Sequence, residues 1–393
     1  MKKKLPKKIL SSRLYDIIHV MKNIFVSCGE VSGDIYAGSF IREALRIDPA
    51  LKIWGMLGSE GVKAGGCETW SYEELKLMGL LEIIPAIPRI ILLKNKITRE
   101  VLNVNPDAAV LIDCPDFHLR LAASLRKSGY DGKIISLIPP TVWAWRAGRV
   151  KNLRRDFDFC LPLFSFEHEF LLNSGVKSLW KSHPLVHELE SVKVSESFTK
   201  RFGRERIIAL MPGSRRYDIR FHLEILIGAA KILGTLGYLP VFSIATGLSA
   251  DLADELRERV SESGFEFWEG SGRELMLASE AAAGVSGTVS VEAMILRRYM
   301  VVIYNMRSVN YAILKRLVRV KNISIPNMLT GRQVYPELLC DEAKPERIVK
   351  ELERYLNDED EKSEIDNELT EARLSMGEGN ASEFWAETVL RSK

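Results

Sequence analysis

The sequence has few cysteines and lacks any apolar run long enough to cross a bilayer. None of the five cysteines forms a CxxC pair; they are Cys28, Cys67, Cys114, Cys160 and Cys340. This pattern argues against a disulfide framework or a structural zinc site and favours reduced thiols in a cytosolic protein. The longest apolar runs fall short of the roughly 20 residues that a spanning helix needs.

Several common catalytic signatures are also missing. The six histidines show no metal-ligand spacing, so we predict no metal site. The glycine-bearing turns match neither the GxGxxG dinucleotide fingerprint nor the GK[ST] ending of a P-loop, and there is no GxSxG elbow. We therefore predict no cofactor. A net charge of +3 over 393 residues does not by itself indicate a nucleic-acid partner, and we predict none.

The length and the 46% hydrophobic content are enough for two cores, and two domains is the expectation for a chain of this size. Residues 1–20 carry five lysines in their first eight positions, but Arg13, Asp16 and His19 interrupt any apolar signal core. We interpret them as a basic N-terminal extension rather than a signal peptide.

Apolar strand-like runs alternate with helical stretches twice along the chain. The first series begins at Met21 and the second near Arg206, with a polar, charge-rich stretch between them at about 187–204. Such alternation predicts βαβ units and parallel sheets. We expect an N-terminal Rossmann-like domain over 21–187 and a C-terminal one over 205–359.

Two glycine-bearing turns follow predicted strands, one in each half. They are Gly29–Asp34 (GEVSGD) and Met211–Arg215 (MPGSR). Amides at a helix start suit an anion, and in doubly wound folds ligands bind at the carboxyl ends of the strands. Each turn is equally compatible with a plain helix cap, in the first case by Ser32 or Asp34.

Two further segments of the first half carry chemistry-bearing side chains. In IDCPDF, Asp113 and Asp116 lie at a strand end, where an acid can accept a proton from a substrate hydroxyl; a turn-forming Asp-Pro-Asp unit is the alternative. PPTVWAWRAGR offers Trp143 and Arg146, which suit sugars, acyl chains or phosphates, or else simple domain packing.

Two segments of the second half complete the set. SGTVSVE places small hydroxyl residues at a turn that can cradle phosphate, with Glu292 one helical turn further on to hold ribose hydroxyls; a capped helix is the alternative. IPNMLTGR offers Asn327, which alone is a weak signal.

A long apolar segment links the first two motifs of the N-terminal half. Its apolar residues include Leu80, Leu81, Ile83, Ile84, Ile87, Ile90 and Ile91, and Lys94, Lys96 and Arg99 follow. We expect its two prolines to break it, which excludes one long core helix. An apolar patch with a basic rim suits a membrane interface or an acyl-chain pocket, although a buried loop and helix would read the same way.

Taken together, these segments resemble the lipid-A-disaccharide synthase family. The resemblance rests on seven motifs in order: GEVSGD, MGLLEI, IDCPDF, PPTVWAWR, MPGSR, SGTVSVE and IPNMLTGR, over about residues 21–345. The chain departs from the family pattern at Ser182–His187, where GHPLxD is usual, at Asp218, where glutamate is usual, and at Pro140, where serine is common.

The resemblance implies an α/β GT-B fold, in which two Rossmann-like domains face a cleft and residues of about 360–393 pack back on the N-terminal domain. It implies an inverting glycosyltransferase that joins UDP-2,3-diacylglucosamine to 2,3-diacylglucosamine 1-phosphate (lipid X), giving a β-1,6-linked disaccharide and UDP. It also implies a metal-independent enzyme attached peripherally to the cytoplasmic face of the inner membrane.

By the same resemblance, Asp113 is the candidate general base, Glu30 lies near the reacting centre and Asn327 is needed for activity. Arg215 is expected to meet the donor pyrophosphate. The other substrate-binding candidates are Gly213, Ser214, Ser286, Gly287, Thr288, Glu292, Ser32, Trp143 and Arg146.

Two other hypotheses remain open from the sequence. One is a GT-B transferase with another acceptor or a sugar-nucleotide epimerase, which has no use for the apolar segment. The other is a non-catalytic paralogue that binds sugar nucleotide or membrane, against which the joint presence of Asp113, Glu30, Arg215 and Asn327 argues.

Overall fold

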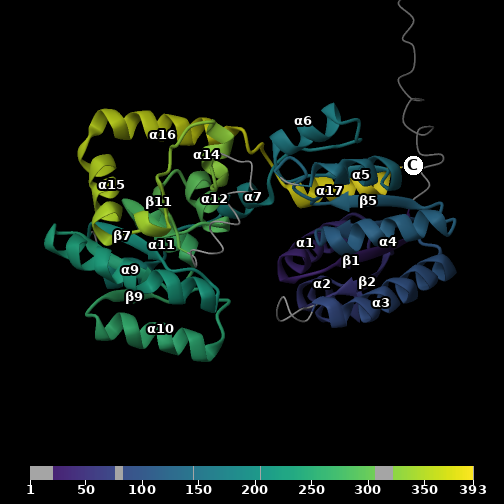
Figure 1. Ribbon diagram of the computed structural model, residues 1–393, viewed down its shortest axis with the longest axis horizontal. Helices are drawn as coiled ribbons and strands as arrows, with labels where there is room; N and C mark the ends of the chain where they lie inside the picture. Colours follow the sequence, from purple (N-terminus) through teal and green to yellow (C-terminus); the bar gives the residue numbers. More distant parts are fainter. Residues whose placement is uncertain (1–20, 76–82, 145, 204, 306–321, 393) are drawn as a thin grey trace, which may run out of the picture.

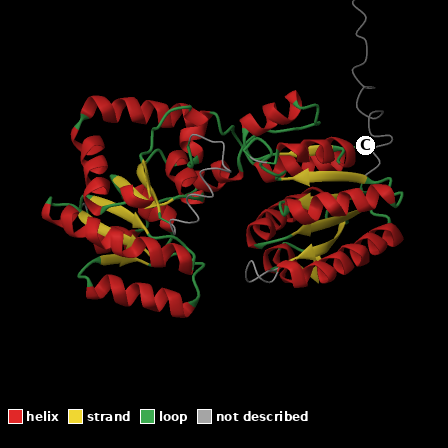
Figure 2. Cartoon of the chain, in the orientation of Figure 1, coloured by secondary structure: helices red, strands yellow, loops and turns green. Residues whose placement is uncertain are grey.

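The computed structural model describes residues 21–75, 83–144, 146–203, 205–305 and 322–392, and for residues 83–85 it describes the backbone alone. The predicted extension over 1–20 and the patch residues Leu80 and Leu81 lie outside these ranges, as do the side chains of Ile83 and Ile84. The described chain forms two lobes, each a sheet covered by helices (Figure 1, Figure 2).

The first lobe contains a six-stranded parallel sheet in the order β3-β2-β1-β4-β5-β6. Its strands are β1 (Asn23–Cys28), β2 (Lys52–Leu57), β3 (Cys67–Ser71), β4 (Ala108–Ile112), β5 (Lys133–Leu137) and β6 (Phe159–Leu161). The helices between them are α1 (Val31–Ile47), α2 (Ser59–Lys63), α3 (Ile83–Val104), α4 (Pro115–Lys127), α5 (Val150–Asp156) and α6 (Ser165–Asn173). Strands β1 and β4 are buried almost throughout because helices cover both faces of a parallel sheet.

The second lobe repeats the design in the order β12-β11-β10-β7-β8-β9. Its strands are β7 (Ile207–Met211), β8 (Leu239–Ser243), β9 (Glu266–Trp268), β10 (Ala281–Val285), β11 (Tyr299–Tyr304) and β12 (Glu337–Leu339). Its helices are α8 (Glu196–Phe202), α9 (Arg216–Thr235), α10 (Ala250–Glu262), α11 (Gly272–Ala278), α12 (Thr288–Ile295), α14 (Ile325–Thr330), α15 (Pro345–Asn357) and α16 (Glu359–Leu374). All strand pairs in both sheets are parallel, so the α/β doubly wound fold predicted from the alternation is confirmed.

Two helices join the lobes. Helix α7 (Pro184–Glu190) follows the first sheet and contacts α12, and the last helix, α17 (Ala381–Arg391), packs on α1 of the first lobe (Figure 1). Trp385 of α17 is 1% exposed within the first core, and its ring meets Tyr36 edge-on at 6.1 Å. Burying an aromatic side chain of this size contributes several kcal/mol, so α17 is a structural part of the N-terminal lobe.

The two helices of the C-terminal tail, α16 and α17, pack on different lobes. Sequence reasoning assigned about 360–393 to the N-terminal domain, but α16 packs against α12, α14 and α15 of the second lobe, and only α17 crosses. Helix α16 buries Ile365, Leu369 and Ala372 in the second core. The chain then turns at Gly377, where Ser182 and Gly377 form a bridge that places the altered Ser182–His187 segment beside the tail.

Helix α3 corrects the expectation that two prolines break the apolar segment. The helix runs from Ile83 to Val104 with Pro88 inside it. Pro85 lies in the first turn, where N–H groups have no helical partner, so only Pro88 removes a bond, at about 3 kcal/mol. The buried side chains of Leu93, Ile97 and Val101 offset this, at about 1.5–3 kcal/mol each. Among the described residues, no helix is both long enough and apolar enough to cross a membrane.

Candidate active site

The first half of the site is a pair of carboxylic side chains at the carboxyl ends of β1 and β4. Glu30 precedes α1, Asp113 precedes α4, and their carboxyl groups are close enough to share a hydrogen bond when one of them is protonated. Burial, followed by the hydrogen bond and the charge of Glu30, raises the pKa of Asp113 to about 7. A carboxyl group that titrates near neutrality is suited to accept a proton from a hydroxyl.

The two turns that carry this pair approach so closely that one must be a glycine. A Cβ on Gly29 would lie 2.2 Å from the Cβ of Cys114, well inside van der Waals contact. Ser32, in the first turn of α1, donates a hydrogen bond of 3.0 Å to Glu30. Asp34 is not at the site: its carboxylate accepts bonds from the backbone N–H groups of Gly58, Glu60 and Gly61, and so fixes α2 to α1.

The described residues of the VWAWR region lie near α4, the helix that follows Asp113. The indole N–H of Trp143 donates to buried Glu167 at 2.9 Å, and its ring meets Phe166 edge-on at 5.0 Å. Burial raises the pKa of Glu167. Arg146 and Arg149 both contact Asp116, in the first turn of α4, with Arg146 at 3.1 Å. Trp143 is thus packed within its own lobe, whereas Arg146 and Asp116 are exposed.

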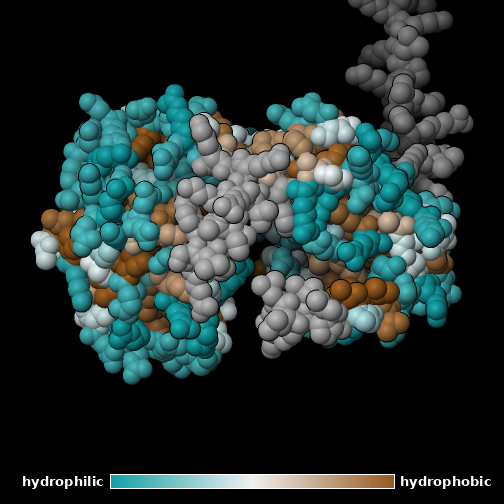
Figure 3. Space-filling model, viewed as in Figure 1, coloured by the Kyte–Doolittle hydropathy of each residue, from teal (hydrophilic) through white to brown (hydrophobic). Residues whose placement is uncertain are grey.

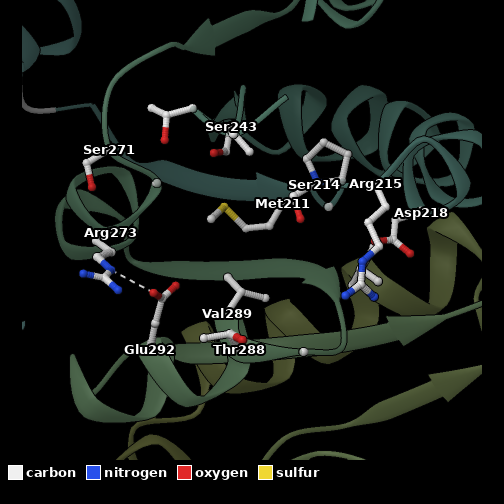
Figure 4. Close-up of a pocket in the computed structure, with 18 of the residues that line it drawn as sticks. Met211, Ser214, Arg215, Asp218, Ser243, Ser271, Arg273, Thr288, Val289 and Glu292 are labelled. Atoms are coloured by element: carbon white, nitrogen blue, oxygen red, sulfur yellow. Dashed lines mark hydrogen bonds and ion pairs between the residues drawn. The ribbon is translucent and has the colours of Figure 1, made fainter. Parts of the chain in front are cut away.

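The second half of the site is a pocket of about 670 Å³ at the carboxyl ends of β7, β8, β9 and β10 (Figure 4). It brings together the predicted residues Gly213, Ser214, Arg215, Ser286, Gly287, Thr288 and Glu292. Sequence reasoning missed Ser243, Thr246, Ser271 and Arg273, which complete the wall. The signal that could have found them is their position just after β8 and β9, where small and hydroxyl residues precede helices.

Glycine is required at the first turn of this pocket. Gly213 has φ +103°, and a Cβ there would lie 2.6 Å from the Cβ of Asp218. The turn leads into α9, with Arg215 exposed at its N-terminus. Helix amides and an arginine at a glycine turn are a suitable seat for a phosphate group.

Arg215 and Arg273 lie at opposite ends of the pocket (Figure 4). The Nε of Arg273 is 2.8 Å from Glu292, and its guanidinium also reaches Glu188 of α7 at 3.1 Å. Burial raises the pKa of Glu292, and Arg273 opposes that rise. The acid predicted to hold ribose is therefore oriented by an arginine that also contacts the helix between the lobes.

Tyr36 of α1 lies within electrostatic reach of both halves of the site. Its pKa is raised to about 12, chiefly by burial and then by the carboxylates of Glu188, Asp113 and Glu292. Asp113 of one lobe and Glu292 of the other are thus both near enough to Tyr36 to affect the pKa of its phenol.

Asn327 is not among the residues that line the pocket. Its side chain is fully buried, and its amide donates to the backbone of Tyr335 and to Glu337 at 2.7 and 2.8 Å. Its amide oxygen accepts from the Tyr335 N–H at 2.8 Å. These bonds attach α14 to the start of β12, so the Asn327 side chain has a structural role in the second lobe.

Two Rossmann-like lobes, with a phosphate-suited pocket on one and a carboxyl pair on the other, define a protein of the GT-B fold class. Solved structures with this fold include the S. aureus MnaA–UDP co-structure (13% identity, TM-score 0.60, 92% of this chain and 94% of that one). Another is the UDP-GlcNAc 2-epimerase from Neisseria meningitidis bound to UDP-GlcNAc (13% identity, TM-score 0.58, 95% and 100% covered). At these identities the similarity establishes the fold alone.

The sequence comparisons identify the family. The family model described as lipid-A-disaccharide synthetase matches residues 24–389. The lipid-A-disaccharide synthase of Geobacter metallireducens is 35% identical over 381 residues, covering 94% of this chain and 97% of that protein. The one from Myxococcus xanthus is 33% identical over 373 residues, covering 93% and 96%. The chain belongs to the lipid-A-disaccharide synthase family and is a glycosyltransferase of lipid A biosynthesis, as the motifs predicted.

Proposed function

We propose that this enzyme transfers a diacylglucosaminyl group from UDP-2,3-diacylglucosamine to the 6-hydroxyl of 2,3-diacylglucosamine 1-phosphate, with inversion at the anomeric carbon. The observation that carries the proposal is the pairing of the two halves of the site. A base near neutral pKa lies on one lobe and a phosphate-suited pocket on the other. Such an arrangement suits a displacement in which nucleophile and leaving group occupy opposite sides of one carbon.

In the proposed step, the hydroxyl oxygen of the acceptor bonds to the donor's anomeric carbon while Asp113 accepts the proton of that hydroxyl. The bond from that carbon to the UDP oxygen breaks, and both electrons leave with UDP. Glu30, hydrogen-bonded to Asp113, raises its basicity. The transfer is proposed to use no cofactor, as the family resemblance implies.

On the donor side, Arg215 with Ser214 and the amides at the start of α9 is proposed to hold the pyrophosphate. The turn Ser286–Thr288 adds further donors at the start of α12. Glu292, which Arg273 orients, is proposed to accept hydrogen bonds from the ribose hydroxyls. Fixed donors aimed at the departing UDP stabilise the charge that it acquires.

On the acceptor side, Ser32, Trp143 and Arg146 are proposed to flank the lipid-bearing sugar. Of these, Arg146 has the chemistry to meet the anomeric phosphate, since a guanidinium binds phosphate in a bidentate way and its present partner, Asp116, is 69% exposed. A role of Asn327 in activity stays a prediction. It is proposed to act by holding α14 through its hydrogen bonds to Tyr335 and Glu337.

Helix α3 is proposed to place the enzyme on the cytoplasmic face of the inner membrane. Ile87, Ile91 and Leu92 are 42%, 45% and 60% exposed, and Ile90 is half-buried beside them. Apolar surface also gathers over α3 in the space-filling view (Figure 3). Arg89, Lys96 and Arg99 are exposed on the same helix, a combination suited to an anionic lipid surface.

The test is to incubate the purified protein with the two diacylglucosamine substrates and to measure UDP and the tetraacyl disaccharide by mass spectrometry. Both products in equal amount are expected. UDP release without disaccharide, or no product at all with protein that binds UDP, would overturn the proposal.

A further inference from the structure

A buried histidine joins the two turns that carry the carboxyl pair. His118, in the first turn of α4, is 3% exposed. Its Nδ1 lies 2.6 Å from the backbone carbonyl oxygen of Asp113, and its Nε2 lies 2.9 Å from the hydroxyl of Ser27. Ser27 is fully buried in β1, three residues before Glu30.

The chemistry of these two partners assigns the proton on the ring. A carbonyl oxygen only accepts, so Nδ1 must carry the hydrogen, and Nε2 then accepts from the Ser27 hydroxyl. Burial lowers the pKa of His118 to about 4, so the ring is neutral near pH 7. Both hydrogen bonds are therefore directional contacts of one tautomer.

The backbone that His118 holds is in a costly conformation. Asp113 and Cys114 have φ of +54° and +43°, the left-handed region, at about 1–2 kcal/mol per residue. The N–H of Asp113 donates to Leu137 of β5 at 3.0 Å, and its carbonyl accepts from His118. With both ends of the residue fixed in this way, the Asp113 side chain is directed toward Glu30 rather than along the strand.

We propose that His118 is a positioning residue for the transfer reaction. Through Nδ1–H its neutral ring clamps the backbone carbonyl of Asp113, and this clamp directs the Asp113 carboxyl toward Glu30. The hydrogen bond from the Ser27 hydroxyl to Nε2 favours the tautomer that carries the Nδ1 proton. The inference rests on the proposed role of Asp113 as the base. It assigns to His118 no contact with substrate.

Three substitutions separate the two hydrogen bonds. In His118→Asn the amide N–H takes the place of Nδ1–H and keeps the bond to Asp113. In His118→Gln the amide takes the place of Nε2 and loses that bond, and His118→Leu loses both. His168→Leu is the matched control, because that ring is hydrogen-bonded at 3.0 Å to the Ser178 hydroxyl of the same lobe.

The expected result is a loss of kcat of tenfold or more in the Gln and Leu variants, with the KM for the UDP-sugar and the Kd of UDP within twofold of wild type. The Asn variant should keep kcat within about threefold. The pH profile of kcat should also shift in the Gln variant. Within the described part of the chain, the ionisable groups that interact with Asp113 are Glu30, Cys114 and Tyr36, and they are the same in all variants.

Two results would overturn the inference: the Asn variant losing as much activity as the Leu variant, or UDP affinity falling in parallel with kcat. A measurement without substrate keeps it separate from the proposed function. Long-range ¹H–¹⁵N spectra at pH 7 should show His118 as the neutral Nδ1–H tautomer, and an Nε2–H tautomer contradicts the clamp. If wild type makes no disaccharide but shows the Nδ1–H tautomer, the proposed function fails and the clamp stands as geometry.

Discussion

The Nε of Arg273 lies 2.8 Å from the carboxylate of Glu292, at the end of the pocket opposite Arg215 (Figure 4). Arg273 also reaches Glu188 of α7 at 3.1 Å. A carboxylate already held in one orientation loses little conformational entropy when it accepts hydrogen bonds from the two ribose hydroxyls of a nucleotide. In the proposed donor site, the pair therefore connects the ribose-binding acid to the helix between the lobes.

Glu292→Gln should weaken UDP binding about 10- to 100-fold, the worth of about 1.5–3 kcal/mol for hydrogen bonds to a charged group. Isothermal titration calorimetry measures it. Glu280→Gln is the matched control, since Glu280 forms an arginine pair of similar geometry with Arg206 outside the pocket. Equal affinities for the two variants would remove Glu292 from the donor site.

Gly29→Ala should destabilise the protein by about 1–3 kcal/mol and reduce activity, because its Cβ would overlap Cys114. Adding Cys114→Gly should restore much of the loss, since it removes the overlapping Cβ and relieves the left-handed φ of that residue. Urea denaturation of both variants checks this. Gly148→Ala, with no atom near the added Cβ, is the control and should be neutral.

The rate should rise with pH through about 7, because the base must be unprotonated and burial, then Glu30, raise the pKa of Asp113 to that value. Glu30→Gln should move this limb to lower pH, since one of the two causes is removed. The free energy of unfolding depends on pH in the opposite direction, because the protonated carboxyl favours the folded state. The folded state binds a proton that the unfolded state releases near pH 4, so this contribution is present at low pH and lost as pH rises through about 7.

That pH prediction is checked by kcat profiles of wild type and Glu30→Gln from pH 5 to 9. A limb that stays in place in the variant would show that Glu30 does not set the basicity of Asp113. Asp113→Asn should abolish the corresponding slope in unfolding free energy, which is a readout that needs no substrate.

Serine substitutions at Ile87, Ile91 and Leu92 together should lower binding to anionic vesicles about 100-fold or more, because each apolar side chain contributes about 1.5–3 kcal/mol when buried. Sedimentation with vesicles measures the bound fraction. The control replaces Leu236 and Leu374, equally exposed but in the second lobe, with serine. If the α3 variant sediments with vesicles like the wild type, α3 is not the membrane-binding surface of the protein.

The fold was predictable because buried strands have a recognisable local sequence pattern. The runs of β4, β7 and β10 are apolar throughout, and a glycine or an acid follows each of them within two residues. Pocket residues that are consecutive in sequence, such as Gly213–Arg215 and Ser286–Thr288, follow from the same rule.

The remainder depends on contacts between distant segments. Nothing near Asn327 in the sequence indicates that its amide is occupied by Tyr335 and Glu337, and nothing near Arg273 indicates Glu188 and Glu292 as its partners. The course of α3 through Pro88 was mispredicted because tertiary burial of Leu93, Ile97 and Val101 outweighs a local helix-breaking signal.

The most direct test of the account is the rate of disaccharide formation by Asp113→Asn at saturating substrates and pH 8, measured beside its affinity for UDP. We expect the rate to fall by about 10²- to 10⁴-fold, the usual worth of a general base, with the UDP Kd within twofold of wild type. A variant that binds UDP normally and still forms disaccharide within tenfold of the wild-type rate would contradict the assignment of Asp113 as the base.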